Sequence, residues 1–367
     1  MSPTASIRQR PDGAWRARYR DDEGREHSRH FRLKRDAQEW LDGIAASRRT
    51  GTYVDPSASK LTLQAFYADW APRQVWATGT RTAADRALAA CDFRAIPFGK
   101  LRRSHAEAWV KAMQSTLAAS TIRTRVKYVR GVLRAAVLDR ALSEDPTDGL
   151  KLPAVRKLEH SMRIPTPAEV AAIRGRAEPF LLPLLDLMAY AGLRIGEAAG
   201  IQAHDVDWMR RTVHVARQIQ NRPGSREICA PKHGSERRVP VPSALTERLA
   251  EAVTESGTFG QAGWLLPGDP PSPNALRRWF EKACRSAGVD GVSPHDFRHY
   301  YASGLIRSGL DAVSVARAMG HASPTITLSI YAHLFPDAAD RTRAAAAELM
   351  AAGPDSADDL RTTAAEA

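Results

Sequence analysis

The spacing of apolar residues changes twice along the chain, once at a stretch that contains Gly, Pro and Ser and once at a short stretch that starts with a proline. Residues 7–31 alternate polar and apolar side chains, as strands do, whereas between residues 61 and 152 apolar side chains recur at helical spacing. From residue 165 onward both patterns occur. The two breaks, at 51–59 and 153–157, read as linkers. The 367 residues therefore exceed one ordinary domain, and two or three are expected.

The first segment predicts a three-stranded sheet covered by one helix. Asp12-Gly13 separates two alternating runs, which is typical of a hairpin. A helix from Lys34 to about Arg48 would cover the apolar face of the sheet. On the middle strand the opposite face carries three basic residues, Arg16, Arg18 and Arg20. A solvated face is the ordinary interpretation, and DNA contact is the alternative that a basic protein favours.

The second segment predicts four or five helices. The helix near residues 120–140 has a basic face, and its candidate DNA-binding residues are Arg123, Arg125, Lys127 and Arg130. This face could lie against a phosphate backbone or could be solvated.

Charge points to the same kind of partner. Lys and Arg number 53 against 41 Asp and Glu, which gives a net charge of +12 and indicates a polyanion such as nucleic acid. Binding of this kind weakens steeply with salt. The three cysteines, Cys91, Cys229 and Cys284, form neither a disulfide framework nor a zinc spacing. We expect buried thiols in a reducing cytoplasm, and no signal peptide or membrane span.

The third segment contains five short fragments that together hold phosphate ligands, proton carriers and a nucleophile. The apolar run 180–190 predicts a core helix that Gly192 ends, with Arg194 at the junction that follows. Glu197, three residues further on, could orient the Arg194 guanidinium. Lys232 lies in what looks like a tight turn between two strands of one short sheet. There it would act as a mobile proton donor or be simply solvated.

Two Ser-Pro pairs predict helix starts. After Ser293-Pro294, His295 and Arg298 are three residues apart and share a face at a helix N-terminus, where an anion is favoured. His299 supports this site or faces the core. After Ser323-Pro324, a short helix carries Tyr331, a residue type that is more often core than catalytic. His321 precedes this helix at a backbone break after Gly320.

The ordered set resembles the tyrosine recombinases, or phage integrases, of the subgroup with an added arm-DNA-binding domain. The family pattern of Arg, Lys, His-x-x-Arg, His or Trp, and Tyr maps onto six residues, Arg194, Lys232, His295, Arg298, His321 and Tyr331. Tyr300 and Tyr301 stand where relatives usually carry Thr and Phe, and either is an alternative nucleophile. Tyr331 fits the family position.

The resemblance implies an α+β, mostly α fold. It consists of a three-stranded-sheet-plus-helix arm-type DNA-binding domain (1–56), a helical, SAM-like core-binding domain (60–153), a mixed α/β catalytic domain with a short antiparallel sheet (163–340), and a C-terminal tail (341–367).

The implied reaction is a phosphoryl transfer without a metal or other cofactor. Tyr331 attacks a DNA phosphodiester and forms a 3′-phosphotyrosyl link. Arg194 and Arg298 stabilise the charge on phosphorus-bound oxygens. His295 would act as the base, Lys232 would protonate the leaving group, and His321 would bind the phosphate.

Other functions remain open at this point. A type IB topoisomerase-like strand transferase shares the catalytic set, and a relative that has lost catalysis would only bind DNA. The resemblance implies that the protein binds double-stranded DNA at core-type and arm-type sites and forms a homotetramer on synapsed DNA. It also implies DNA-bending and excision factors as protein partners. It implies the cytoplasm of a bacterial host, at the nucleoid, as the location, and a mobile element such as a prophage as the cargo.

Overall fold

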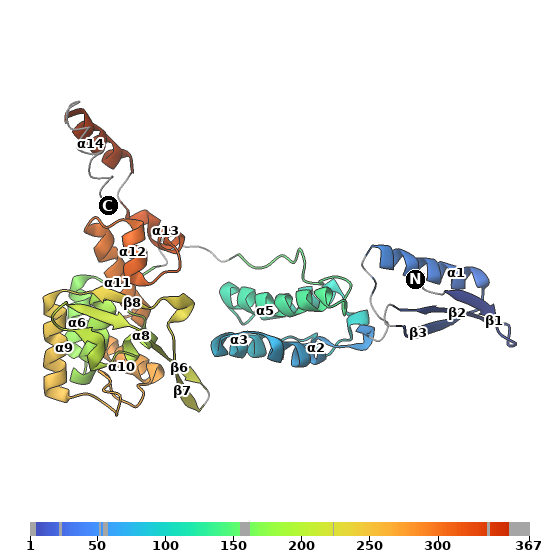
Figure 1. Cartoon of the computed structure of the whole chain (residues 1–367), viewed down its shortest axis with the longest axis horizontal. Coiled ribbons are helices and arrows are strands. Elements are labelled where there is room, and N and C mark those ends of the chain that lie inside the picture. The colour runs from blue at the N-terminus through green and yellow to red at the C-terminus, as the bar shows by residue number, and fades with distance from the viewer. Residues whose placement is uncertain are drawn as a thin grey trace. The chain divides into compact units, whose positions relative to one another are not determined.

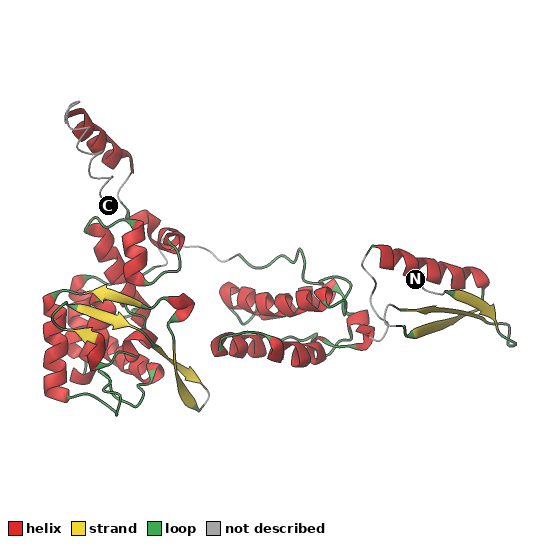
Figure 2. Cartoon of the chain, in the orientation of Figure 1, coloured by secondary structure: helices red, strands yellow, loops and turns green. Residues whose placement is uncertain are grey.

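The computed structural model describes residues 5–21, 24–50, 53, 58–154, 162–222, 224–335 and 338–351. This part of the chain is mostly helical with short antiparallel strands, which confirms the expected α+β class (Figure 2). It divides into two compact units, residues 1–157 and 158–367, with separate hydrophobic cores. The linkers expected at 51–59 and 153–157 lie largely outside the described residues.

The first unit contains the N-terminal sheet module and the helical module (Figure 1). Its strands and α-helices are β1 (Ser6–Gln9), β2 (Trp15–Arg20), β3 (Glu26–Phe31), α1 (Lys34–Arg49), α2 (Leu63–Trp70), α3 (Thr78–Ala89), α4 (Arg103–Met113) and α5 (Ala119–Leu138).

Alternation along β2 positions the basic face of the N-terminal module. The strands pair antiparallel in the order β1-β2-β3, and α1 packs on the side of Ala17 and Tyr19, both of which are buried. The Tyr19 ring lies 5.4 Å, centroid to centroid, from the Trp40 ring of α1. Arg16 and Arg20 are exposed, because they alternate with Ala17 and Tyr19 along the strand and point to its other face. The three-strand prediction and its arginine face are confirmed.

The helical module has four α-helices among its described residues, within the expected number. Thr62 starts α2 because its hydroxyl accepts a hydrogen bond from the Ala65 amide at 3.2 Å. Helix α3 packs along α5. The buried Trp109 donates its indole N–H to the Ala90 carbonyl at 2.7 Å, so that burial leaves no unsatisfied donor on the ring.

The second unit contains the mixed domain. Its strands and α-helices are α6 (Pro167–Arg176), α7 (Leu182–Tyr190), α8 (Ile195–Ala199), β4 (Val206–Asp207), β5 (Thr212–Val215), β6 (Gln218–Arg222), β7 (Ser225–Cys229), β8 (Arg237–Pro240), α9 (Ser243–Ser256), α10 (Pro273–Ser286), α11 (Pro294–Arg307), α12 (Ala312–Met319), α13 (Pro324–Tyr331) and α14 (Ala338–Ala351).

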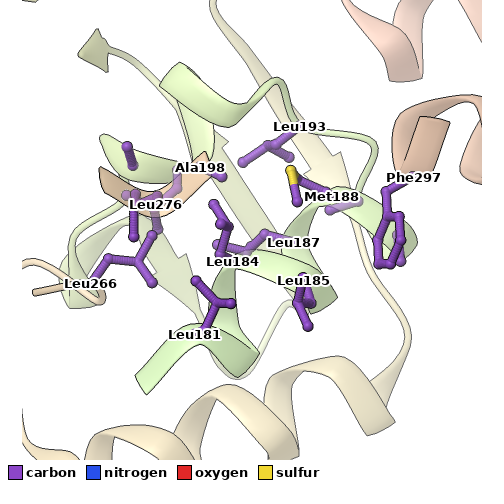
Figure 3. Packing of buried hydrophobic residues seen from close by; sticks show 14 of the residues in the cluster. Leu181, Leu184, Leu185, Leu187, Met188, Leu193, Ala198, Leu266, Leu276 and Phe297 are labelled. Atoms are coloured by element: carbon purple, nitrogen blue, oxygen red, sulfur yellow. The ribbon is translucent and has the colours of Figure 1, made fainter. Parts of the chain in front are cut away.

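Helix α7 forms the centre of this core. Its apolar side chains pack with Leu193, Leu276 and Phe297 from other elements (Figure 3). Seven of its nine residues are buried, which explains why the sequence of this segment shows no polar face. A smaller cluster joins α11, α12 and Tyr331 of α13. The core helix expected at 180–190 is confirmed, beginning two residues later.

A short antiparallel sheet is present in this unit, as expected, but the prediction that all its strands form a single sheet is wrong. Strands β4, β5 and β8 form one antiparallel sheet, and β6 pairs with β7 in a separate hairpin (Figure 1). Lys232 therefore does not lie at the tip of a hairpin. It begins a 3-10 turn, Lys232–Gly234, that links β7 of one sheet to β8 of the other. The error arose because alternation indicates a strand but not its partner.

The predicted helix boundaries around the candidate site are confirmed. Gly192 adopts a φ of +65° directly after α7 ends. Asp311 caps α12 by accepting hydrogen bonds from the amides of Val313 and Ser314, at 2.8 and 3.0 Å. Gly320 ends that helix in the left-handed conformation. The helix expected from Ala338 is present, whereas Pro336 and the acidic tail beyond Gly353 lie outside the described residues.

We expect Gly192→Ala to destabilise the second unit by roughly 2–4 kcal/mol, because an added methyl group combines left-handed backbone strain with overpacking. The new Cβ would overlap the Tyr301 ring and lie 3.2 Å from the Met319 sulfur. Urea unfolding of the full chain measures the change. Gly304→Ala is the matched control, since Gly304 lies inside α11 with open space around it. It should leave stability unchanged or raise it by up to about 1 kcal/mol. Equal shifts for both variants would contradict the packing argument.

Candidate active site

Arg194 is held at the start of α8 by Glu197. The backbone turns at Gly192, and Arg194 becomes the residue that precedes the helix. Its Nη1 donates to Glu197 Oε1 at 2.6 Å, and its amide donates to Oε2 at 3.0 Å. Burial alone would raise the pKa of Glu197, but the Arg237 and Arg194 charges outweigh it and hold that pKa below its usual range. The orienting role expected of Glu197 matches this geometry.

Arg237 on β8 is a member of this cluster that the sequence reasoning missed. Its Nη2 donates to Glu197 Oε2 at 3.0 Å, and its Nε donates to the Ala318 carbonyl at 3.1 Å. A third bond, from Nη1 to the Ser235 carbonyl at 3.1 Å, reaches the turn that carries Lys232. The sequence did contain one signal for the burial of Arg237. Alternation along β8 places Arg237 on the same face as the buried Val239.

Arg298 is the most deeply buried of the candidate arginines, with 1% of its surface exposed. Its Nη1 donates to the Gly192 carbonyl and its Nη2 donates to the Met319 carbonyl. It therefore ties the end of α7 to the end of α12. Burial, followed by repulsion from Arg194, lowers its pKa, yet a guanidinium remains charged at neutral pH. Among the described residues no carboxylate forms an ion pair with this charge.

His321 lies close to these arginines. Arg194 Nη2 donates to the carbonyl of Gly320, the preceding residue, at 3.4 Å. The His321 Nδ1 is 2.8 Å from the hydroxyl of the buried Thr327. Burial, and then the Arg298 and Arg194 charges, lower the pKa of His321 to about 4. The ring is therefore neutral at pH 7 and can donate or accept one hydrogen bond at each nitrogen.

His295 is exposed at the first turn of α11. Partial desolvation and the Arg298 charge lower its pKa from the usual value. Its ring contacts that of His299 with centroids 4.6 Å apart, edge to face. The Asp296 carboxylate accepts from the Ser293 amide and hydroxyl, each at 2.7 Å, so this carboxylate occupies one amide at the helix start that was expected to favour an anion.

Tyr331 is buried, with 1% of its surface exposed. Its hydroxyl lies 2.6 Å from Nδ1 of His299, which is also buried. Burial raises the pKa of Tyr331 to about 12, against the opposing effect of Arg298. The residue expected as its base was His295, but the hydrogen bond runs to His299. His299 thus faces the nucleophile position as well as the core.

Lys232 stands apart from the other five positions. It is exposed, and the described residues give its ammonium no hydrogen-bond or ion-pair partner. Its link to the cluster runs through the backbone, because Arg237 binds the carbonyl of Ser235 at the end of the same turn. Tyr301, one alternative nucleophile, lies against Gly192, and the other, Tyr300, meets the Tyr190 ring edge to face.

The cluster carries an excess of positive charge. Arg194, Arg237 and Arg298 contribute three guanidinium groups, and the first two share the single carboxylate of Glu197. Neutral His295, His299 and His321 do not change this balance at pH 7. In a poorly solvated setting such an imbalance favours an anion with several oxygen acceptors, such as a phosphodiester.

The arginine face of the N-terminal module is organised by one carboxylate. Glu26 lies 3.2 Å from Arg16, 3.4 Å from Arg18 and 4.0 Å from Arg20. Three cations around one anion leave the face positive. Because these side chains are largely exposed, each pair contributes little to stability and is free to exchange for phosphate contacts.

The basic face of α5 is partly used within its own module. Arg123 donates to the Pro153 carbonyl at 2.9 Å, and Arg130 donates to the hydroxyl of the buried Thr147 at 3.1 Å. Both therefore fasten the segment that follows α5. Lys127 is exposed, Arg125 is half-buried, and neither has a hydrogen-bond or ion-pair partner among the described residues. These two remain the freer candidates for contact with DNA.

Within the described ranges no group of three or more His, Cys, Asp or Glu side chains is arranged to hold a metal ion. None of the helices described is long and apolar enough to cross a membrane.

Comparison with known sequences identifies the family of the chain. Residues 165–337 match the model of the phage integrase family. The chain is 30% identical over 250 residues to tyrosine recombinase XerD of Mycobacterium leprae, a match that covers 62% of this chain and 72% of that protein. It is 26% identical over 255 residues to a XerC-like tyrosine recombinase of Caldanaerobacter subterraneus, covering 62% of this chain and 65%, just under two thirds, of that protein.

Solved structures share the fold at lower identity. The Tn1549 transposon integrase, in complex with transposon right end DNA, has a TM-score of 0.63 and 20% identity over 79% of this chain and 100% of that one. Lambda integrase, as a dimer bound to a COC′ core site, has a TM-score of 0.58 and 16% identity. This match covers 90% of this chain and 95% of that one. It is also known as a tetramer bound to a Holliday junction. The arginine cluster and Tyr331 lie inside the region that matches the family, and the chain belongs to the tyrosine recombinases, the phage integrase family of site-specific DNA recombinases.

Proposed function

We propose that this protein is an integrase that cleaves and rejoins DNA at specific sites through a 3′-phosphotyrosyl intermediate on Tyr331. One observation carries the proposal. Arg194 and Arg237 share the Glu197 carboxylate. The buried Arg298 adds a third guanidinium, whose charge acts on a phenol that is held by a histidine. This combination suits an oxyanion on phosphorus and a nucleophile next to it.

The atoms balance without a cofactor. The Tyr331 oxygen forms a bond to phosphorus, the bond from phosphorus to the 5′ oxygen breaks, and the phenolic proton leaves. Lys232 gives a proton to the departing 5′ oxygen. Because a phosphodiester becomes another phosphodiester, its bond energy is retained, and a second DNA end can reverse the step. Arg194 and Arg298 stabilise the added charge, and loss of one such donor costs roughly 3–4 kcal/mol in the barrier.

Glu197 and Arg237 act as positioning residues in this scheme. Glu197 accepts one hydrogen bond from the Arg194 side chain and one from its backbone amide. Arg237 connects Glu197 to the Lys232 turn and to the end of α12. His321 would donate a hydrogen bond to a phosphate oxygen. His295 is exposed, and it would contact the bound DNA.

The partners that we propose follow from the charge and from the relatives. Double-stranded DNA would bind as core-type sites at the second unit and α5, and as arm-type sites at the N-terminal sheet. Lambda integrase forms a tetramer on a Holliday junction, and we propose the same assembly here, with α14 reaching a neighbouring subunit. Its Leu349 and Met350 side chains are 69% and 86% exposed and need an apolar partner. Bending and excision factors would act on the same complex.

We place the protein in the cytoplasm of a bacterial host, at the nucleoid, where it would integrate and excise a mobile element such as a prophage. A type IB topoisomerase-like strand transferase is the second candidate function, favoured by the shared catalytic set. It would relax supercoiled plasmid without a specific site, whereas an integrase yields recombinants. A relative without catalysis would bind DNA and form no covalent adduct.

Tyr331→Phe should abolish the SDS-stable adduct that the wild-type protein forms with a nicked duplex, because phenylalanine has no attacking oxygen. The duplex would carry a sequence selected from a random library by binding to the full chain. DNA affinity should be unchanged. Tyr300→Phe and Tyr301→Phe are the matched controls, and each should keep the adduct. An adduct that persists in Tyr331→Phe would place the nucleophile elsewhere.

Arg237→Ala should slow adduct formation by about 10²-fold, the scale of one misplaced catalytic donor, with little change in DNA affinity. The cause is release of Glu197, and with it of Arg194. Arg237→Lys keeps the charge and should recover part of the rate. Arg238→Ala removes the same charge from the exposed face of the same strand, and we expect it to cleave at the wild-type rate. Equal losses in the two alanine variants would show that charge alone matters. Thermal unfolding of each variant separates slow cleavage from lost fold.

Replacing Arg16, Arg18 and Arg20 together with Ala should weaken arm-site binding and flatten its dependence on salt. Each lost phosphate contact lowers the slope of log K against log salt by about 0.9, so a fall of roughly 2–3 is expected. Arg35→Ala is the control, because Arg35 lies on α1, which covers the opposite face of the sheet. Fluorescence anisotropy at several salt concentrations measures both. An unchanged slope in the triple variant would show that this face does not bind DNA.

A further inference from the structure

The hydroxyl of Tyr331 has one hydrogen-bonding partner of special interest, His299. The Tyr331 oxygen and His299 Nδ1 are 2.6 Å apart, and the two rings meet edge-on at 67° with centroids 5.5 Å apart. Both side chains are buried. An O–H to N contact this short inside a core is a strong hydrogen bond, because water does not compete for it.

His299 is neutral in the free protein. Burial, and then the neighbouring His295 and Arg298, lower its pKa to about 4, against the opposing effect of Asp296. A neutral imidazole has one nitrogen with a proton and one without. If the proton is on Nε2, the nitrogen that faces Tyr331 is an acceptor, and the phenol donates to it.

The geometry favours His299 over His295 as the direct partner of the nucleophile. His295 contacts the His299 ring and is exposed, and the hydrogen bond from the phenol runs to His299. Both histidines lie on α11 four residues apart, a rise of about 6 Å. Arg298, between them in sequence, brings any bound phosphate to within about one helical turn of His299.

We propose that His299 receives the Tyr331 proton as the phenol attacks phosphorus. The O–H bond of Tyr331 breaks and an N–H bond forms at Nδ1 of His299, while the oxygen bonds to phosphorus and the 5′ oxygen leaves. In the reverse step His299 returns the proton. This role rests on the proposed recombinase function, and it reassigns the base from His295, which instead contacts the His299 ring.

The same pair keeps the free protein inert. With pKa values of about 12 for Tyr331 and about 4 for His299, the proton stays on oxygen before DNA binds. A phosphodiester beside Arg298 brings negative charge close to His299, and negative charge favours the protonated imidazole. As the oxygen bonds to phosphorus, the phenol also becomes more acidic. Both changes move the proton in the direction the reaction needs.

The first test uses the unaltered chain. Nitrogen-15 NMR of the histidine rings, with His299 assigned by its loss in His299→Gln, reports which nitrogen carries the proton. We expect Nε2 protonated and Nδ1 accepting a hydrogen bond that disappears in Tyr331→Phe. A protonated Nδ1 in the wild-type protein would overturn the proposal, because that nitrogen could not accept.

The second test measures adduct formation on the selected nicked duplex. His299→Gln should slow it by about 10²–10⁴-fold, the contribution of a general base, at unchanged DNA affinity. Replacing Tyr331 with a fluorinated tyrosine, a more acidic phenol, should then restore at least tenfold of the rate. His295→Gln is the matched control, four residues away on α11, and the fluorinated residue should restore no rate in it. A purely structural role of His299 would not respond to the acidity of the phenol.

The outcomes separate the two proposals. If Tyr331→Phe abolishes the adduct but His299→Gln reacts at the wild-type rate, His299 is not the proton acceptor, and the recombinase function stands. If His299→Gln is slow but the fluorinated residue restores nothing, the proton-transfer role is again overturned. If Tyr331→Phe still forms the adduct, both proposals fall. Should His299→Gln unfold, the ring whose accepted hydrogen bond disappears in Tyr331→Phe identifies His299, and the NMR result on that wild-type ring decides.

Discussion

The buried guanidinium of Arg298 holds the catalytic unit together. It binds the carbonyls of Gly192 and Met319, which lie just beyond α7 and at the end of α12. Helix C-termini carry unpaired carbonyls and partial negative charge, so a cation between two of them satisfies both at once. Burying a charge without a carboxylate is costly, and a hydrophobic residue would often be more stable. Its presence is understandable where an anion must be bound.

A network of the remaining charges extends from this point. Glu197 joins Arg194 to Arg237, and Arg237 continues to the Ala318 and Ser235 carbonyls. Elements far apart in the sequence are thereby held at fixed distances around a small positive region. A phosphate would complete the network as its missing counter-charge. The exposed Lys232 lies at one end of it, on a short turn between two sheets, where little packing restrains it.

Tyr331, the proposed nucleophile, is hydrogen-bonded to His299 but covered. Tyr331 and Arg298 are each 1% exposed, whereas His295 and Lys232 are open to solvent. A buried hydroxyl cannot meet a phosphate unless the atoms that cover it move. Tyr331 is the last residue of α13, a helix of eight residues that packs mainly on α12. A short helix of this kind costs less to shift than the long helices of the core, and it carries the residue whose exposure must be controlled.

Local signals in the sequence determined much of this protein: the glycine after α7, the Asp311 cap, the alternation along β2, and the order of the six candidate catalytic residues. Each depends on neighbours within a few residues, where backbone preferences and side-chain periodicity act directly. Only the tertiary structure decided that β8 pairs with β5 rather than β7, that Arg237 shares Glu197 with Arg194, and that Tyr331 meets His299 rather than His295. These contacts join residues 20 or more positions apart, and they depend on how whole elements pack. A sequence pattern shows which face a residue lies on, but not what it will face.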